Sequence, residues 1–380
     1  MKYGEFVRRM PGAGDLHRRR TLLQRIRLDG PLLALLLLLT ATGLVVLYSA
    51  SGQDLETVQR QGRFFLLAYG VMLVVAQIDL QRVARLAPWA YLGGVVLLLA
   101  VTFFGTHAKG AQRWLNLGGF QFQPSELMKI AMPMAMAWYL AARDLPPRAR
   151  HIGVSLLIIA IPTLLIAEQP DLGTAILVAS SGAFVLFLAG LSWRYIVAAI
   201  VVLLASVWPL WQFGLHDYQR RRVLTLLDPE SDKLGAGWNI IQSKTAIGSG
   251  GYEGKGWLHG TQSHLDFLPE GHTDFIIAVL AEEWGLRGVL ALLLVYTLLL
   301  MRGMWIAVRA ASGFGRLLAG ALVLTFFVYV FVNMGMVSGL LPVVGVPLPL
   351  ISQGGTALVT LFAGFGLLMA IAAEKRTLMR

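Results

Sequence analysis

Residues 31–50 read PLLALLLLLTATGLVVLYSA and contain no charged side chain. An α-helix of roughly 20 apolar residues is long enough to cross the hydrocarbon core of a bilayer. This run is continuously apolar, whereas a strand of a membrane barrel would alternate apolar and polar residues. The stretch therefore predicts a transmembrane helix near the start of the chain.

Nine further apolar segments follow the same pattern. With the first they lie near 31–50, 64–78, 86–106, 127–142, 152–167, 172–193, 195–215, 274–301, 317–341 and 356–373. Of the 380 residues, 56% are hydrophobic and only 14% charged, and the mean hydropathy is +0.66. These values are too apolar for an ordinary soluble domain. We predict an all-α polytopic membrane protein with ten transmembrane helices.

The basic residues fall mainly on one side of this predicted topology. About twenty of the 32 lysines and arginines lie in the two terminal tails and in the loops after the second, fourth, sixth and eighth helices. Since basic loops stay in the cytoplasm, we expect both termini to be cytoplasmic. We therefore attribute the net charge of +11 to the basic residues that set membrane orientation, and we expect no nucleic-acid partner.

Three regions follow from this topology. They are a basic cytoplasmic tail at 1–30, a ten-helix membrane domain at 31–373 and a cytoplasmic tail at 374–380. The first region is polar and basic, so we expect no cleavable signal peptide. The longest outer loop, 214–273, joins the seventh and eighth helices and is rich in Gly, Trp, Tyr, Gln and His. We expect it to be ordered and periplasmic, because a long connection of this kind is usually functional or disordered and its composition argues against disorder.

The sequence excludes several kinds of chemistry. It contains no cysteine, and therefore neither a disulfide nor a cysteine-based metal site. Its seven histidines show no metal-ligand spacing, and it has no Walker-type loop or HExxH motif. We expect no ATP hydrolysis or zinc proteolysis, and no nucleotide, haem or flavin cofactor.

Asp274 is the first candidate for chemistry. It ends the long outer loop and opens the eighth span, a helix N-terminus where an anion is favoured. The alternative is that Thr273 and Asp274 cap the helix. Further along the same span, Glu282 and Glu283 are either functional intramembrane acids or, through Glu283 and Arg287 four residues apart, part of a structural pair.

Glu126 and Lys129 stand one helical turn apart at the outer end of the fourth span, where Ser125 fits an N-cap. A local ion pair and a substrate contact are both open from spacing alone. Beyond the seventh span, Arg220, Arg221 and Arg222 contact either lipid headgroups or a pyrophosphate.

Glycines and two short motifs complete the candidates. The runs Gly248–Gly251 and Gly254–Gly256 form either plain turns or backbone nests for an anion. The stretches Glu168–Thr174 and Leu350–Thr356 lie at the outer starts of two spans. Each either serves only to begin a helix or contributes to a functional site.

Several motifs, taken in order, resemble the SEDS family of peptidoglycan glycosyltransferases over about residues 30–373. They are Gly110–Trp114, Phe122–Glu126, Gln169–Thr174, Gln242–Lys244 through Gly260, and Pro269–Phe275. The RodA branch, rather than the division branch FtsW, is indicated by Asp228–Asp232, Gly256–Ser263 and Val343–Pro347. The chain departs from the family pattern at Gln353, where relatives usually carry Tyr, and at Gly271, where a basic or polar residue is common.

The resemblance implies polymerisation of lipid II into glycan strands, during cell elongation, at the outer face of the bacterial cytoplasmic (inner) membrane. It places the essential acid on Asp274 and further site residues on Glu126 and Lys129. Asp274 would act as general base, or would anchor a divalent cation such as Mg²⁺ or Mn²⁺. The further candidates for binding substrate are Arg113, Asp171, Arg220, Arg221, Arg222, Lys244, Lys255, His272 and Ser352.

The resemblance also implies partners. They are a class B penicillin-binding protein as transpeptidase and other membrane proteins of the elongation machinery. Two other readings stay open from the residues themselves: a flippase that moves the same lipid-linked sugar, and a non-catalytic scaffold. A carrier should place polar groups near the bilayer midplane and in inverted repeats, and neither pattern is visible here.

Overall fold

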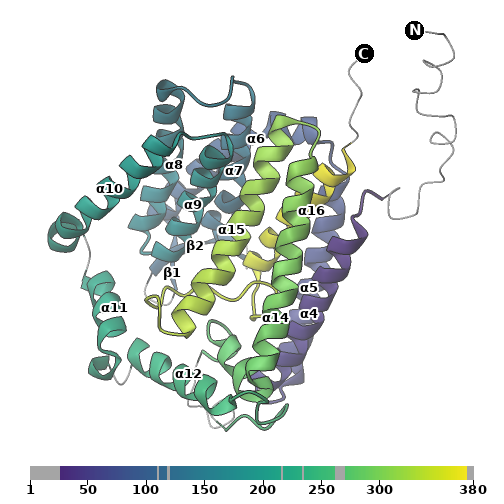
Figure 1. Ribbon diagram of the computed structural model, residues 1–380, viewed down its shortest axis with the longest axis vertical. Coiled ribbons are helices and arrows are strands. Elements are labelled where there is room, and N and C mark those ends of the chain that lie inside the picture. Colours follow the sequence, from purple (N-terminus) through teal and green to yellow (C-terminus); the bar gives the residue numbers. More distant parts are fainter. Residues whose placement is uncertain are drawn as a thin grey trace.

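This computed structural model contains ten long helices, and all of them except α10 lie in one bundle (Figure 1). It describes residues 26–374 except 109–110, 118–119, 215–216, 233–234 and 262–269. Residues 1–25 of the predicted tail at 1–30 and residues 375–380 of the tail at 374–380 lie outside the described residues, as do Gln262, Ser263 and Pro269 of the predicted motifs. Every predicted apolar segment contains a helix. These helices are α4 (Gly30–Ala50), α5 (Leu55–Ala76), α6 (Leu80–Phe104), α7 (Pro124–Ala141), α8 (Ala149–Glu168), α9 (Leu172–Leu188), α10 (Trp193–Pro209), α14 (Ile276–Arg309), α15 (Gly313–Val337) and α16 (Thr356–Ala373).

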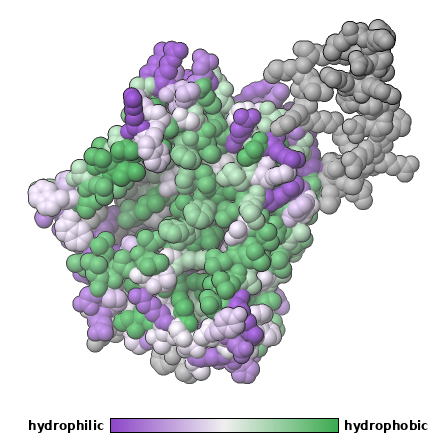
Figure 2. Space-filling model, in the orientation of Figure 1, coloured by the Kyte–Doolittle hydropathy of each residue, from purple (hydrophilic) through white to green (hydrophobic). Residues whose placement is uncertain are grey.

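Seven of the described helices are long and apolar enough to span a membrane. They are α4, α6, α8, α10 with its π-helical extension η1 (Leu210–Gly214), α14, α15 and α16. Helix α9 is a shorter apolar helix of 17 residues, and α5 and α7 carry several polar side chains. An apolar belt crosses the visible face between polar ends (Figure 2). The polytopic helical membrane fold is confirmed, while the count of ten crossings stays a prediction.

Close helix contacts hold the bundle together where side chains are small. Helix α16 packs against α5, and a Cβ added at Gly366 would overlap the carbonyl oxygen of Met72. Small residues allow this approach, which is how membrane helices gain packing energy without a hydrophobic drive. Helix α10 differs, because none of its residues is buried, and in Figure 1 it lies apart from the bundle.

Two helix limits differ from the prediction for local reasons. Helix α5 begins at Leu55 rather than near 64, because the Asp54 side chain caps it by accepting hydrogen bonds from Glu56 N and Thr57 N. Helix α14 runs to Arg309 rather than 301, and it is broken by non-helical backbone at Gly285. Both extensions contain polar residues at the helix ends, so a prediction based on apolar runs did not include them.

The outer loops carry secondary structure that hydropathy does not predict. Three strands form an antiparallel sheet in the order β1 (Thr106–Ala108), β2 (Ala111–Leu117) and β3 (Phe120–Phe122). Loop 214–273 contains α11 (Asp217–Leu227), the 3₁₀ helix η2 (Pro229–Asp232) and α12 (Ala236–Gly250). The expected order of this loop is confirmed for its described residues. This small sheet is an addition to the helical fold that was not predicted.

Candidate functional site

One cavity collects half of the predicted site residues, six of twelve, at the end of the bundle where α7 and α9 begin. It holds about 580 Å³ and is walled by the sheet, the starts of α7, α9 and α16, the turn before α14, loop residues 343–347, and helices α11 and α12. Its charged and amide-bearing side chains are Arg113, Gln123, Glu126, Lys129, Asp171, Arg222, Asn239, Glu270, Asp274 and Gln353. Residues more than 200 positions apart in the sequence thus face one space.

Asp274 lies in the turn that precedes α14. Helix α14 takes Phe275 as its N-cap without a side-chain cap hydrogen bond, so the interpretation of Thr273 and Asp274 as the cap is wrong. The side-chain amide of Asn333 donates to the carbonyl oxygens of Asp274 at 2.8 Å and of Val346 at 2.7 Å. These bonds hold the Asp274 backbone against loop 343–347.

Loop 340–355 clamps the same turn from the other side. The Ser352 hydroxyl donates to Thr273 O at 2.5 Å and accepts from Leu348 N at 2.8 Å, and Gln353 N donates to His272 O at 3.1 Å. Gly345 has a φ of +74°, and a Cβ there would lie 3.5 Å from Asp274 Oδ2. Ser352 and His272 therefore position the turn, and neither side chain lines the cavity.

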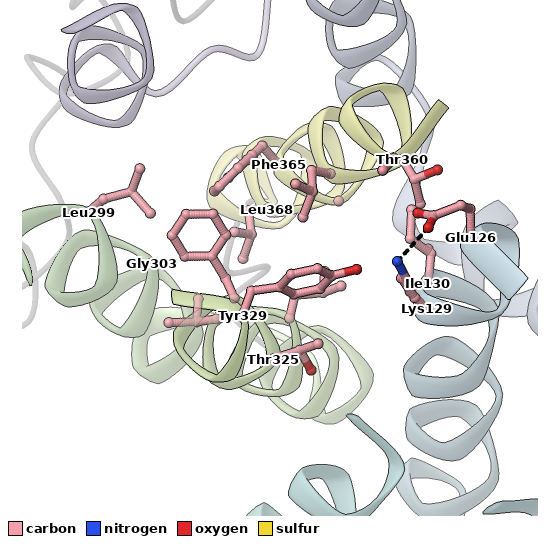
Figure 3. Close-up of a pocket in the computed structure, with 16 residues that line it drawn as sticks. Glu126, Lys129, Ile130, Leu299, Gly303, Thr325, Tyr329, Thr360, Phe365 and Leu368 are labelled. Atoms are coloured by element: carbon pink, nitrogen blue, oxygen red, sulfur yellow. Dashed lines mark hydrogen bonds and ion pairs between the residues drawn. The ribbon is translucent and has the colours of Figure 1, made fainter. Parts of the chain in front are cut away.

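Glu126 and Lys129 form a buried ion pair at the start of α7. The Lys129 Nζ–Glu126 Oε1 distance is 2.5 Å, and Nζ lies 5.0 Å from the centroid of the Tyr329 ring (Figure 3). The second carboxylate oxygen of Glu126 is buried without a hydrogen-bond partner. Helix α7 has Gln123 as N-cap with Pro124 following, so Ser125 is not the cap that we predicted.

Arg113 and Asp171 join the sheet to α9. Arg113 donates to the carbonyl oxygens of Gln169 at 3.1 Å and of Pro170, and its Nη1 lies 3.8 Å from Asp171 Oδ1. Asp171 also caps α9 by accepting from Thr174 N at 3.2 Å, and it accepts from the Gln123 side chain at 2.9 Å. The helix-start reading of this motif is confirmed, and the same residues also line the cavity.

The remaining predicted cations separate. Arg222 lines the cavity, whereas Arg220 donates to Gln212 O at 2.9 Å and Arg221 is exposed. Lys244 is an exposed residue of α12 whose side chain lies over Gly339. Lys255 is bound to Glu282 with an Nζ–Oε1 distance of 2.7 Å. Of these five cations, only Arg222 is among the residues that line this cavity.

The two intramembrane acids, Glu282 and Glu283, lie directly before the break in α14, and both accept hydrogen bonds. Glu282 accepts from Lys255 Nζ and from Thr261 N at 2.8 Å, and Glu283 accepts from the Ser49 hydroxyl. Gly285 interrupts the helix between Glu283 and Arg287, so four-residue helical spacing does not relate them.

The glycine-rich stretch at 250–256 binds this break instead of an anion. The backbone N–H groups of Lys255 and Gly256 donate to Glu282 O at 3.0 Å and Glu283 O at 2.9 Å, and Gly254 N donates to Gly250 O at 2.8 Å. The prediction of an anion nest at 254–256 is therefore wrong.

Four site residues escaped the sequence reading. They are Asn239 and Glu270 in the cavity, and Tyr329 and Asn333 on α15 behind it. An asparagine inside an apolar span is a signal that could have drawn attention to Asn333. Tyr329 carried no such signal, because tyrosine is common in membrane helices.

A resident metal site is not formed by the described residues alone. Among them no three His, Cys, Asp or Glu side chains converge. Asp274 and Glu270 line the same cavity, and Mg²⁺ is commonly held by one or two carboxylates together with substrate phosphates. The residues present therefore suit a cation that arrives with a phosphorylated substrate.

Comparison with known proteins gives consistent relatives. The family described as "Cell cycle protein", which groups FtsW, RodA and SpoVE, matches residues 31–377. The peptidoglycan glycosyltransferase MrdB of Escherichia coli K12 is 56% identical over 96% of this chain and 98% of its own length. A probable peptidoglycan glycosyltransferase FtsW of Geobacter metallireducens is 37% identical over 92% of this chain and 96% of its own.

Solved structures agree. A chain from a study of a peptidoglycan synthase complex that coordinates polymerization and crosslinking has a TM-score of 0.79 and 33% identity, covering 90% of this chain and 97% of that one. The rod shape determining protein RodA of Thermus thermophilus has a TM-score of 0.69 and 29% identity, covering 90% of this chain and 96% of its own. The higher identity to MrdB than to FtsW matches the branch that the loop motifs indicated.

Proposed function

The chain belongs to the FtsW, RodA and SpoVE family and is a peptidoglycan glycosyltransferase, and from this premise we propose that Asp274 is its general base. The observation that carries the proposal is the composition of the cavity. Asp274 shares it with three cationic side chains, Arg113, Lys129 and Arg222. A base and a set of cations in one cleft suit transfer of a sugar from a pyrophosphate leaving group.

The proposed substrate is lipid II, a disaccharide-peptide joined to a lipid through pyrophosphate. Guanidinium groups bind phosphate oxygens in pairs, and an ammonium group adds a point charge. Arg222 and Arg113 reach the cavity from α11 and β2, and Lys129 from α7. We assign these three side chains to the donor pyrophosphate.

The proposed step is a single displacement. The Asp274 carboxylate takes the proton of the acceptor 4-hydroxyl while that oxygen forms a bond to the anomeric carbon of the donor. The bond between this carbon and the phosphate oxygen breaks, and the lipid pyrophosphate leaves with the electron pair. An inverting hydrolase needs a second carboxyl to protonate a poor leaving group, whereas pyrophosphate leaves as a stabilised anion. One carboxylate therefore suffices, and the cations offset the developing charge.

If the reaction uses a divalent cation, the carboxylates of Asp274 and Glu270, which both line the cavity, would hold it. When bound it would supply positive charge to the leaving group. Asp274 would then hold the cation as well as face the acceptor.

The chain is an integral membrane protein, and we place its cavity on the periplasmic side with both termini in the cytoplasm. Support comes from the basic loops, which occur at the bundle end opposite the cavity. As its crosslinking partner in elongation we propose a class B penicillin-binding protein. The support is the structural neighbour, whose study describes polymerization together with crosslinking.

The test is polymerisation of purified lipid II by the full-length chain with its transpeptidase. We expect Asp274→Asn and Asp274→Ala to lower the rate by roughly 10² to 10⁴-fold, as for other general bases. Asp217→Asn is the matched control, because the Asp217 side chain is fully exposed on α11. Glycan strands of normal yield from the folded Asp274 variants would end the assignment. Lipid II transport without polymerisation would favour the flippase.

A further inference from the structure

A second cavity lies between the end of α7 and the start of α8, at the bundle end opposite the catalytic cavity. It holds about 670 Å³ and is lined by Arg143, Arg148, Arg150, His151, Tyr139 and Asp144, together with Ala142 and Val154. Three guanidinium groups thus face one aspartate. No salt bridge within 4.0 Å joins these arginines to an acid in the described part of the chain.

Aromatic and imidazole groups organise this cluster. The Arg143 guanidinium lies 3.6 Å from the Tyr139 ring centroid and donates to Tyr139 O. His151 Nε2 accepts from Arg150 Nε at 3.3 Å, which leaves Nδ1 to donate to the Tyr139 hydroxyl at 3.3 Å. A neutral imidazole fixed in this way spaces the arginines without adding a charge. Tyr139 thus fixes Arg143 and His151, while Arg148 and Arg150 are exposed beside them.

An apolar stripe begins at the same place. Val154 lines the cavity, and Leu157 and Ile161 follow on the same face of α8, with exposed fractions of 40%, 64% and 47%. Their spacing of three and four residues places them in one line along the helix. A ligand bound at the arginines would thus meet an apolar surface that leads into the hydrocarbon region. Free phosphate has no apolar part that could pack against that surface, whereas a phospholipid has acyl chains that can.

We propose that this cavity binds the phosphate groups of an anionic phospholipid, with its acyl chains along the α8 stripe. Arginine forks match phosphate oxygens, and basic pockets between membrane helices bind such headgroups. A headgroup with two phosphates, as in cardiolipin, would balance the cluster. The site would link lipid composition to α7, which carries Glu126 and Lys129 at its other end.

The test is native mass spectrometry of the purified full-length chain titrated with cardiolipin, phosphatidylglycerol, phosphatidylethanolamine and inorganic phosphate. We expect retention of cardiolipin above phosphatidylethanolamine, with roughly fivefold weaker binding for each guanidinium removed. The variants are Arg143→Gln/Arg148→Gln/Arg150→Gln and the milder Arg148→Gln/Arg150→Gln, which spares the stacked Arg143. Arg82→Gln/Arg85→Gln is the control, because it removes two exposed arginines at the start of α6, on the same end of the bundle.

The outcomes are separable. Loss of cardiolipin in the cluster variants, with retention in the control, supports the site. Equal loss in the control would show a general charge effect and would overturn it. Unchanged binding in folded cluster variants would also overturn it. Displacement of cardiolipin by an equal concentration of inorganic phosphate would overturn the phospholipid assignment.

Discussion

Lys129 is held by two neighbours of different kinds, an acid on its own helix and an aromatic ring on α15. The Glu126 carboxylate pairs with the ammonium group, and Tyr329 extends from α15 toward the same group (Figure 3). At a site from which water is excluded, the contact between a cation and an aromatic ring contributes about 2 kcal/mol of interaction energy. Tyr329 is therefore a positioning residue for a proposed phosphate ligand.

Two substitutions separate the ring from the hydroxyl of Tyr329. We expect Tyr329→Leu to lower kcat/KM for lipid II by roughly tenfold or more, because the ring support is lost. Tyr329→Phe keeps the ring and should stay within about threefold of the parent, because a cation–π contact needs only the ring. Steady-state kinetics measures both. Equal loss in the two variants would contradict a role for the ring.

Asn333 provides a second residue-scale prediction. Its amide joins the carbonyl oxygens of Asp274 and Val346, so Asn333→Leu leaves two acceptors without their donor. We expect a loss of about 1–3 kcal/mol in stability and a lower kcat with little change in KM. Thermal unfolding and kinetics measure these. The control is Thr325→Val, because Thr325 is buried in the same helix and donates only to Ala321 O of its own helix. An unchanged kcat in Asn333→Leu would show that Asn333 does not position Asp274.

At the scale of elements, the break in α14 is a junction between a membrane helix and the outer loop. Leu286 N donates to Gly251 O at 2.9 Å, and Gly256 N donates to Glu283 O. A Cβ at Gly285 would overlap the backbone nitrogen of Gly254, and both residues have positive φ. Only glycine permits both this approach and this conformation.

We expect Gly285→Ala to destabilise the fold by about 2–4 kcal/mol, because backbone strain and overlap add together. Gly248→Ala on α12 is the control, since a Cβ there meets nothing within 4 Å. That control should be neutral or stabilise by about 0.5–1 kcal/mol. Thermal unfolding in detergent measures both variants. Similar unfolding midpoints for Gly285→Ala and Gly248→Ala would show that the junction can accommodate a Cβ at Gly285.

The sequence predicted which segments are helical better than where they end or what joins them. Hydropathy located α4 and α15 because their sides are apolar throughout. It missed the first turns of α5, which are polar and begin at the Asp54 cap. It also missed the junction at Gly285, because the backbone that meets this glycine lies about thirty residues earlier in the chain.

At the scale of the molecule, the fold joins distant stretches into one site. Motif likeness selected Asp274, Glu126, Lys129 and Arg113, all of which line the cavity. It also selected Lys244 and Lys255, which the structure places elsewhere. A motif marks the residues of a loop together and does not tell a cation that faces the substrate from one that fixes the loop. That distinction requires the contact partners, which lie far away in the sequence.

Membrane sidedness is the last whole-molecule property, and the chain suits a direct test because it contains no cysteine. Gly248 on α12 and Ala311 between α14 and α15 are exposed at opposite ends of the bundle. We expect a membrane-impermeant maleimide to label Gly248→Cys in intact spheroplasts, and Ala311→Cys only after permeabilisation. The physical reason is that basic segments stay in the cytoplasm, and Arg309 and Arg316 flank the loop between α14 and α15. Labelling in the reverse order would place Asp274 on the cytoplasmic side, where a periplasmic polymerase could not use it.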